Sequence, residues 1–300
     1  MPIEPLLPRF VGDRLDTIRS GLASALEQRV IGDDAEDKRA AIMLAPGERW
    51  FDESRPIHRI HSDSAMFIGG MRALLLQSLH PLAMAGVARH SQYRTDPWGR
   101  LQRTADFLAA TTFGPADVAE RAVERVIAVH SRVNGTTSDG RRYSAADPHL
   151  LRWVHVAELD SFIAAHRAYG ADRLSDFEYD AYVEDMAMVA RKLGVPAPPM
   201  SVRGLRDQLH SFRPELGSSA DSRDAAKYLL LQPPLDAVSR IPYSLIAAAA
   251  IAILPAWARV ELRIPILPLA DRIVFRPIGQ AVTGTIRWAT SPEGHGPAAH

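Results

Sequence analysis

The stretch DPHLLRWVHVAELDSFIAAHRAYG, residues 147–170, decides the fold class. It opens with Asp147-Pro148, a capping residue followed by a proline suited to the first turn of a helix. Leu151, Leu159 and Phe162 then recur at helical spacing until Gly170. We therefore predict one long helix that ends near Gly170.

Similar start and stop signals lie on both sides of this stretch. Most of the remaining chain has helical periodicity, and almost no segment alternates as a strand would. The predicted helices start at Ser62-Asp63, Pro81, Asp96-Pro97, Gly114-Pro115, Ser175 and Ser201. We expect the helix after Pro115 to run to Val133, where Asn134-Gly135 would end it. The sequence thus predicts an all-α protein with a single large helical domain.

Composition excludes several functional classes. Lys plus Arg and Asp plus Glu number 35 each, so no net charge favours nucleic acid. The chain has no cysteine, which excludes disulfides, zinc ribbons and thiolate haem ligation. It also lacks GxGxxG, P-loop and GxSxG motifs, which argues against Rossmann enzymes, P-loop NTPases and α/β-hydrolases.

The ends of the chain and one apolar segment bear on location. Met1 to Phe10 lacks the layout of a signal peptide, so we expect a soluble, cytoplasmic protein. The segment Ile241–Pro255 is too short for a membrane span, and we predict a buried helix there. Peripheral membrane contact through the basic, proline-punctuated C-terminal region is compatible with this composition.

His130 stands out among eleven histidines because it lies on an apolar helical stripe. The stripe contains Val123, Val126, Ile127 and Val133. An imidazole that faces a core needs a partner, which is either a protein group or a metal such as haem iron.

Two further groups are chemical candidates. His155 and Glu158 form an HxxE pair on one helical face, which suits either a metal site or ordinary helix packing. Arg100, Arg103 and Thr104 share a face, with Phe107 one turn later. Two guanidiniums beside an apolar surface suit haem propionates or an anionic substrate, and equally a solvated helix face. His58 and His61 are expected at the surface, before a helix.

Several phrases, in this order and spacing, resemble the MpaB/rubber-oxygenase (latex-clearing protein) catalytic-domain family. They are Leu76-Gln77-Ser78-Leu79-His80-Pro81, His90-Ser91, Asp96-Pro97-Trp98-Gly99-Arg100, Arg103-Thr104, Phe113-Gly114, His130-Ser131-Arg132-Val133-Asn134-Gly135, Trp153-Val154-His155 and Gly194-Val195-Pro196. The resemblance covers residues 50–279. It implies a catalytic domain over 50–279. Helical periodicity over Val11–Val30 predicts an N-terminal helical extension over 1–49, and the composition of Ser291–His300 predicts a partly disordered tail over 280–300.

The resemblance implies globin-like helical packing around a buried cofactor pocket that holds haem b. His130, with Val133, matches the family's HxxV pattern for the proximal iron ligand. The family's distal Arg-x-x-Lys-Thr pattern corresponds here to Arg100, Arg103 and Thr104, with arginine in place of lysine. Because a guanidinium stays protonated, Arg103 cannot bind iron or act as a base, but it can donate hydrogen bonds.

Three functional hypotheses follow. The first is a haem-dependent oxidoreductase that uses dioxygen or peroxide on a small apolar or isoprenoid-like substrate. His130 would be the iron ligand, Arg100, Arg103 and Thr104 the distal wall, and His155 a support. The second is a non-haem metal oxygenase that uses His155, Glu158 and His130. The third is a non-catalytic helical protein that binds a lipid or an apolar metabolite.

Overall fold

The computed structural model describes residues 38, 40–91 and 94–290. The predicted helix Val11–Val30 and the predicted disordered tail Ser291–His300 therefore lie outside the described residues. In the described part, α-helices account for nearly all regular structure, and the only sheet is a two-stranded hairpin. The expectation of a single, mainly helical domain is confirmed.

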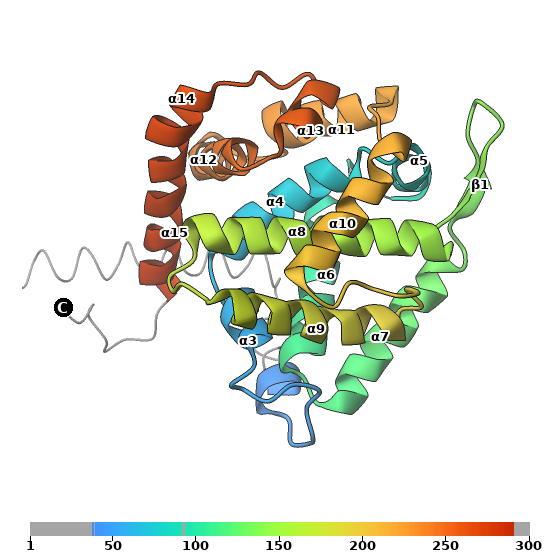
Figure 1. Cartoon of the computed structure of the whole chain (residues 1–300), viewed down its shortest axis with the longest axis vertical. Helices are drawn as coiled ribbons and strands as arrows, with labels where there is room; N and C mark the ends of the chain where they lie inside the picture. Colours follow the sequence, from blue (N-terminus) through green and yellow to red (C-terminus); the bar gives the residue numbers. More distant parts are fainter. Residues whose placement is uncertain (1–37, 39, 92–93, 291–300) are drawn as a thin grey trace, which may run out of the picture.

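The predicted long helix is α8 (Pro148–Tyr169), and it crosses the centre of the molecule (Figure 1). The Asp147 carboxylate caps it by accepting a hydrogen bond from the His149 backbone N–H at 2.9 Å. α4 (Ala65–Gln77) packs along α8, and this contact is the most extensive between any two described helices. Gly69 makes the close approach possible, because a Cβ there would lie 3.0 Å from the Phe162 ring.

A buried arginine joins α4 to its neighbours. Arg72 is 3% exposed, and its guanidinium donates to Asp160 Oδ2 at 2.7 Å and to Ser161 Oγ at 2.7 Å. It also donates to the carbonyl of Ile253 at 3.0 Å, which lies just beyond α12 (Ala237–Ala252). These hydrogen bonds and the ion pair with Asp160 compensate for burying the charge. Arg72 therefore fixes α4, α8 and α12 relative to one another.

The other helices surround this pair (Figure 1). α9 (Asp176–Lys192) and α10 (Val202–Phe212) cover one side of α8, whereas α12 and α15 (Arg276–Thr290) pack on the α4 side. The remaining segments are η1 (Ala40–Leu44), α3 (Pro56–His61), α5 (Pro81–His90), α6 (Pro97–Phe113), α7 (Ala116–His130), η2 (Arg213–Glu215), α11 (Ala220–Leu231), α13 (Ala256–Glu261), α14 (Pro268–Ala270) and η3 (Asp271–Phe275).

The end of α7 differs from the prediction. The helix ends at His130, and Asn134–Thr136 forms strand β1, which pairs antiparallel with β2 (Arg142–Ser144). Gly135 is required by this hairpin and not by a helix cap, because a Cβ there would lie 2.5 Å from the Tyr143 hydroxyl. Sequence patterning missed the hairpin because each strand has only three residues.

Two predictions concern the C-terminal part of the chain, namely the apolar segment 241–255 and the division between residues 279 and 280. The apolar segment 241–255 lies mostly in α12, where Ala247, Ala249 and Ala250 are buried but Ile241 is 67% exposed. The predicted division between residues 279 and 280 falls inside α15. This helix packs closely on α8 because Gly279 has no side chain to collide with the Tyr169 ring.

Candidate cofactor site

His130 lies at the end of a helical hairpin made by α6 and α7. The two helices pack against each other and are joined at Gly114-Pro115, so α7 returns His130 toward the end of the molecule where α6 begins. Arg49 fixes the closed end of the hairpin, because its Nε donates to the carbonyl of Phe113 at 2.9 Å.

The His130 imidazole has no hydrogen-bond, ionic or ring contact among the described residues. It is half-buried, and burial lowers its pKa, so the neutral form is favoured at neutral pH. A neutral imidazole is the form that binds a metal ion.

Among the described residues, the side chains around the open end of this hairpin are half-buried or exposed. In α6, no described side chain from Pro97 to Ala109 is buried, and in α7 none from Glu124 to His130 is buried. The exposed ones include Leu101 at 39%, Ile127 at 45% and Val129 at 59%. Apolar helical surface of this kind ordinarily packs against another apolar body.

The structure places the predicted distal residues on the first turns of α6. Arg100 is half-buried and donates from Nη1 to Ser91 Oγ at 3.1 Å. Arg103 is 63% exposed and pairs with Asp96 Oδ2 at 3.2 Å. Thr104 is exposed and donates to the carbonyl of Arg100 at 3.1 Å, while Phe107 is partly buried against the core beside α8.

His155 and Glu158 lie one turn apart on α8, in the interior. Burial lowers the pKa of His155 to about 4, and its buried Nε2 has no hydrogen-bond partner. Burial also raises the pKa of Glu158 to about 7, although the side chain keeps some accessible surface.

Sequence reasoning missed a buried polar cluster beside Glu158. His61, on α3, contacts Thr112 Oγ1 through Nδ1 at 2.7 Å and the Tyr182 hydroxyl through Nε2 at 2.9 Å. Burial, and then the charge of Glu158, raise the pKa of Tyr182 well above its usual value, which places Glu158 near that hydroxyl. These four side chains come from α3, α6, α9 and α8. Their separations in sequence carry no periodic signal that could have revealed the cluster.

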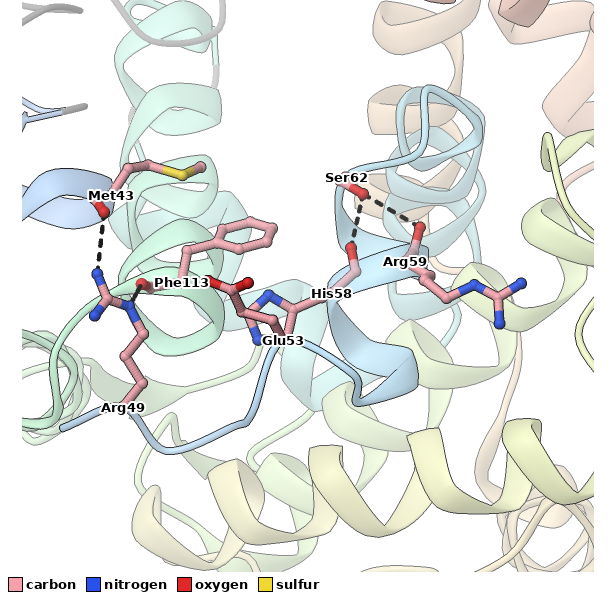
Figure 2. A pocket seen from close by; sticks show the side chains of 7 residues that line it. All are labelled: Met43, Arg49, Glu53, His58, Arg59, Ser62 and Phe113. Carbon is pink, nitrogen blue, oxygen red and sulfur yellow. Dashed lines mark hydrogen bonds between the residues drawn. The ribbon is translucent and has the colours of Figure 1, made fainter. Parts of the chain in front are cut away.

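His58 and His61 precede α4, as expected, but both are half-buried instead of lying at the surface. Both residues belong to α3, and burial lowers the pKa of His61 to about 3. His58 is half-buried and lines a pocket of about 330 Å³ (Figure 2). Met43, Arg49, Glu53, Arg59, Ser62 and Phe113 complete its lining, so no site residue predicted from the sequence contributes to it.

A second group of histidines lies near the start of α8. His80, His149 and Glu215 have ligand atoms that all lie within 4.8 Å of one another. In the described part of the chain no other set of three His, Cys, Asp or Glu residues is arranged in this way. His155 and Glu158 therefore belong to no three-ligand group among the described residues.

No described helix combines the length and the apolar character needed to cross a bilayer. Residues 58–288 match the model of a family described as ER-bound oxygenase mpaB/B'/Rubber oxygenase, catalytic domain. No curated protein and no solved structure shows significant similarity to the chain. The match covers most of the sequence, including α6, α7 and α8 with all the site residues described above. The chain therefore belongs to this family of oxygenase catalytic domains.

Proposed function

We propose that the protein is a haem b-dependent oxygenase, with His130 as the proximal iron ligand. Its partners would be dioxygen or peroxide and a small apolar or isoprenoid-like substrate. The observation that carries the proposal is the neutral, unpartnered imidazole of His130 beside uncovered apolar surface. That imidazole belongs to a chain of an oxygenase family.

The side chains around His130 fit a flat apolar cofactor. Leu101, Ile127 and Val129 offer apolar contact that the described protein does not use. His155 Nε2 is a buried nitrogen with no partner, and such an atom is costly unless a bound group or water satisfies it. The exposed apolar side chains support a bound group at the open end of the α6–α7 hairpin, and the unpartnered His155 nitrogen supports a bound group or water beside α8.

In this proposal the distal residues bind and orient charged atoms. Arg100 and Arg103 would hold the propionates of a bound haem by donating hydrogen bonds, because a guanidinium is a fixed cationic donor. Thr104 adds a hydroxyl, Phe107 supplies an apolar contact, and His155 supports from α8. When bound, haem supplies the one-electron and dioxygen chemistry.

Glu158 has the properties of a proton donor for this chemistry. Its pKa of about 7 allows the carboxyl group to hold or release a proton near neutral pH. The charge of Glu158 acts on the Tyr182 hydroxyl, which pairs with His61 Nε2 at 2.9 Å.

The absorption spectrum of the protein produced with haem supply tests this proposal. We expect a Soret band, and we expect its loss in His130→Ala and its partial recovery in His130→Gly with added imidazole. His210→Ala is the matched control, because His210 is exposed on α10. A wild-type protein that takes up no haemin would refute haem dependence, and full haem binding by His130→Ala would refute the ligand assignment.

The same purified protein separates the alternatives. Stoichiometric iron without porphyrin absorption would favour a non-haem oxygenase, and a bound lipid without metal or haem would favour a binding protein. A non-haem site built on His155 and Glu158 is not favoured, because these two residues lack a third ligand within the described residues.

We also propose a cytoplasmic location with peripheral membrane contact. Leu267, Leu269 and Ile273 are at least 50% exposed and lie among the exposed Arg263, Arg272 and Arg276. An apolar surface with flanking cations suits an anionic bilayer surface. Cosedimentation with anionic vesicles, compared with neutral vesicles, tests this location.

A further inference from the structure

His80 is a buried imidazole without a satisfactory partner. It precedes Pro81 at the start of α5, and its side chain is only 3% exposed. Neither ring nitrogen has a hydrogen bond, and Glu215 Oε2 lies 3.5 Å from Nε2. An unpaired buried polar group costs about 1–3 kcal/mol, so a ligand that satisfies this nitrogen would be stabilising.

The two other side chains of this group face the same point from different segments. His149 lies in the first turn of α8, and its Nε2 is 2.7 Å from Glu215 Oε2. Glu215 ends the short helix η2. Two imidazoles and one carboxylate thus converge from segments that are at least 66 residues apart in the sequence.

The spacing of the ligand atoms is close to that of a metal centre. Zinc–nitrogen and zinc–oxygen bonds of about 2.0–2.1 Å in a tetrahedral site separate neighbouring ligand atoms by about 3.4 Å. The His80–Glu215 distance of 3.5 Å already matches this value. The His149–Glu215 pair would open by a fraction of an ångström as the ion replaces its hydrogen bond.

The surrounding structure fixes these side chains and leaves one side open. Trp153 lies beneath His80, with ring centroids 6.2 Å apart, and its Nε1 donates to the carbonyl of Gln77 at 3.1 Å. Phe212 packs 4.8 Å from the His149 ring. Gly217 N–H donates to the carbonyl of Leu79 at 2.9 Å, which fastens the segment after Glu215 beside His80. His149 and Glu215 remain 40% and 44% exposed, so an ion can enter from solvent and keep water ligands.

The geometry points to a binding site for a divalent transition-metal ion, held by His80, His149 and Glu215 and distinct from His130. Two neutral imidazoles with one carboxylate suit Zn²⁺ and its first-row neighbours better than Ca²⁺ or Mg²⁺. The ion would join the α4–α5 corner, the start of α8 and the connection from α10 to α11 (Figure 1). Its expected effect is to stabilise the domain.

One neighbouring side chain opposes the ion. Arg152 donates from Nη2 to His149 Nδ1 at 3.3 Å, so Nε2 carries the imidazole proton and donates it to Glu215. Metal binding at Nε2 requires this proton to move to Nδ1, and Arg152 must turn away because Nδ1 then carries the proton. Arg152→Met removes the competing donor, together with the guanidinium contact over the Phe212 ring.

Zinc titration of the full chain as purified, with its haem content recorded, tests this site. We expect one saturable Zn²⁺ site per chain by calorimetry and a higher melting temperature when zinc is bound. His149→Gln and Glu215→Gln should each weaken binding by at least about tenfold, because each removes one of three ligands. Both positions are partly exposed, so these variants should fold, and His210→Gln is the matched control.

The outcomes are separable from those of the haem proposal. Haem uptake should be unchanged in His149→Gln, and Arg152→Met should bind zinc more tightly than the wild type. No saturable zinc binding, or zinc binding that neither His149→Gln nor Glu215→Gln weakens, would overturn the site. Zinc affinity unchanged or reduced in Arg152→Met would overturn His149 Nε2 as the ligand atom.

Discussion

Replacing Glu158 with glutamine should change how stability depends on pH. Glu158 has an ordinary pKa of 4.5 in the unfolded chain and a pKa of about 7 in the folded protein, where burial disfavours its charge. Below pH 4.5 the carboxyl group is protonated in both states. As pH rises toward 7, the unfolded state releases the proton and the folded state retains it, so the free energy of unfolding falls.

The size of the effect follows from the pKa difference. A difference of about 2.5 pKa units corresponds to about 3 kcal/mol, at about 1.4 kcal/mol per unit. Glutamine has nearly the same shape and no proton to lose, so Glu158→Gln removes this loss. We expect the variant to gain on the wild type between pH 4.5 and pH 7, by an amount approaching this value, and to keep the gain at pH 8.

Urea unfolding followed by tryptophan fluorescence at pH 4.5, 6, 7 and 8 measures this difference. Glu124→Gln is the matched control, because Glu124 is exposed on α7, and its difference from the wild type should not vary with pH. If the Glu158→Gln difference is constant across the same range, Glu158 is not a desolvated carboxyl group and its proposed role as a proton donor fails.

The contacts of α4 give two further predictions by the same unfolding assay. Arg72→Met should lower the free energy of unfolding by about 3–5 kcal/mol, because it leaves Asp160 with no cation. Arg59→Met, which breaks an exposed ion pair with Glu178, should lower it by at most about 1 kcal/mol. Equal losses in the two variants would contradict the argument from burial. Gly69→Ala should destabilise by about 1–3 kcal/mol, because its Cβ would press on the buried Phe162 ring. Gly70→Ala, with open space around its Cβ, should stabilise by up to about 1 kcal/mol through helix propensity; the reverse order would show that the α4–α8 contact is looser than described.

Helix starts were predictable from the sequence because their signals are local. Asp96, Asp147, Ser175 and Ser201 each accept the capping hydrogen bond that their positions predict. A cap and the backbone N–H it satisfies are two or three residues apart, so the sequence contains both partners. The same local reasoning failed at Gly135, where the determining contact is with Tyr143, across the hairpin.

The clusters of polar side chains were not predictable because they depend on tertiary contacts. His61 and Tyr182 are 121 positions apart, and His149 and Glu215 are 66 positions apart. Nothing in the spacing of these residues distinguishes them from polar residues on the solvent-exposed face of a helix. Packing α8 against α4, α9 and α10 brings them together, and that packing depends on apolar surfaces over the whole domain.

The family resemblance is supported by the local environment at His130 but not at Arg103. His130 is marked both by the resemblance and by its own environment, since it is desolvated and beside uncovered apolar surface. Arg103 is marked by the resemblance alone, and it is 63% exposed and paired with Asp96. Asp96 also caps α6 by accepting from the Gly99 N–H at 2.9 Å, so one carboxylate fixes the start of the helix and the direction of this arginine. To reach a ligand, Arg103 must break its ion pair with Asp96. An anionic group such as a propionate can replace that ion pair with another one, whereas a neutral substrate cannot.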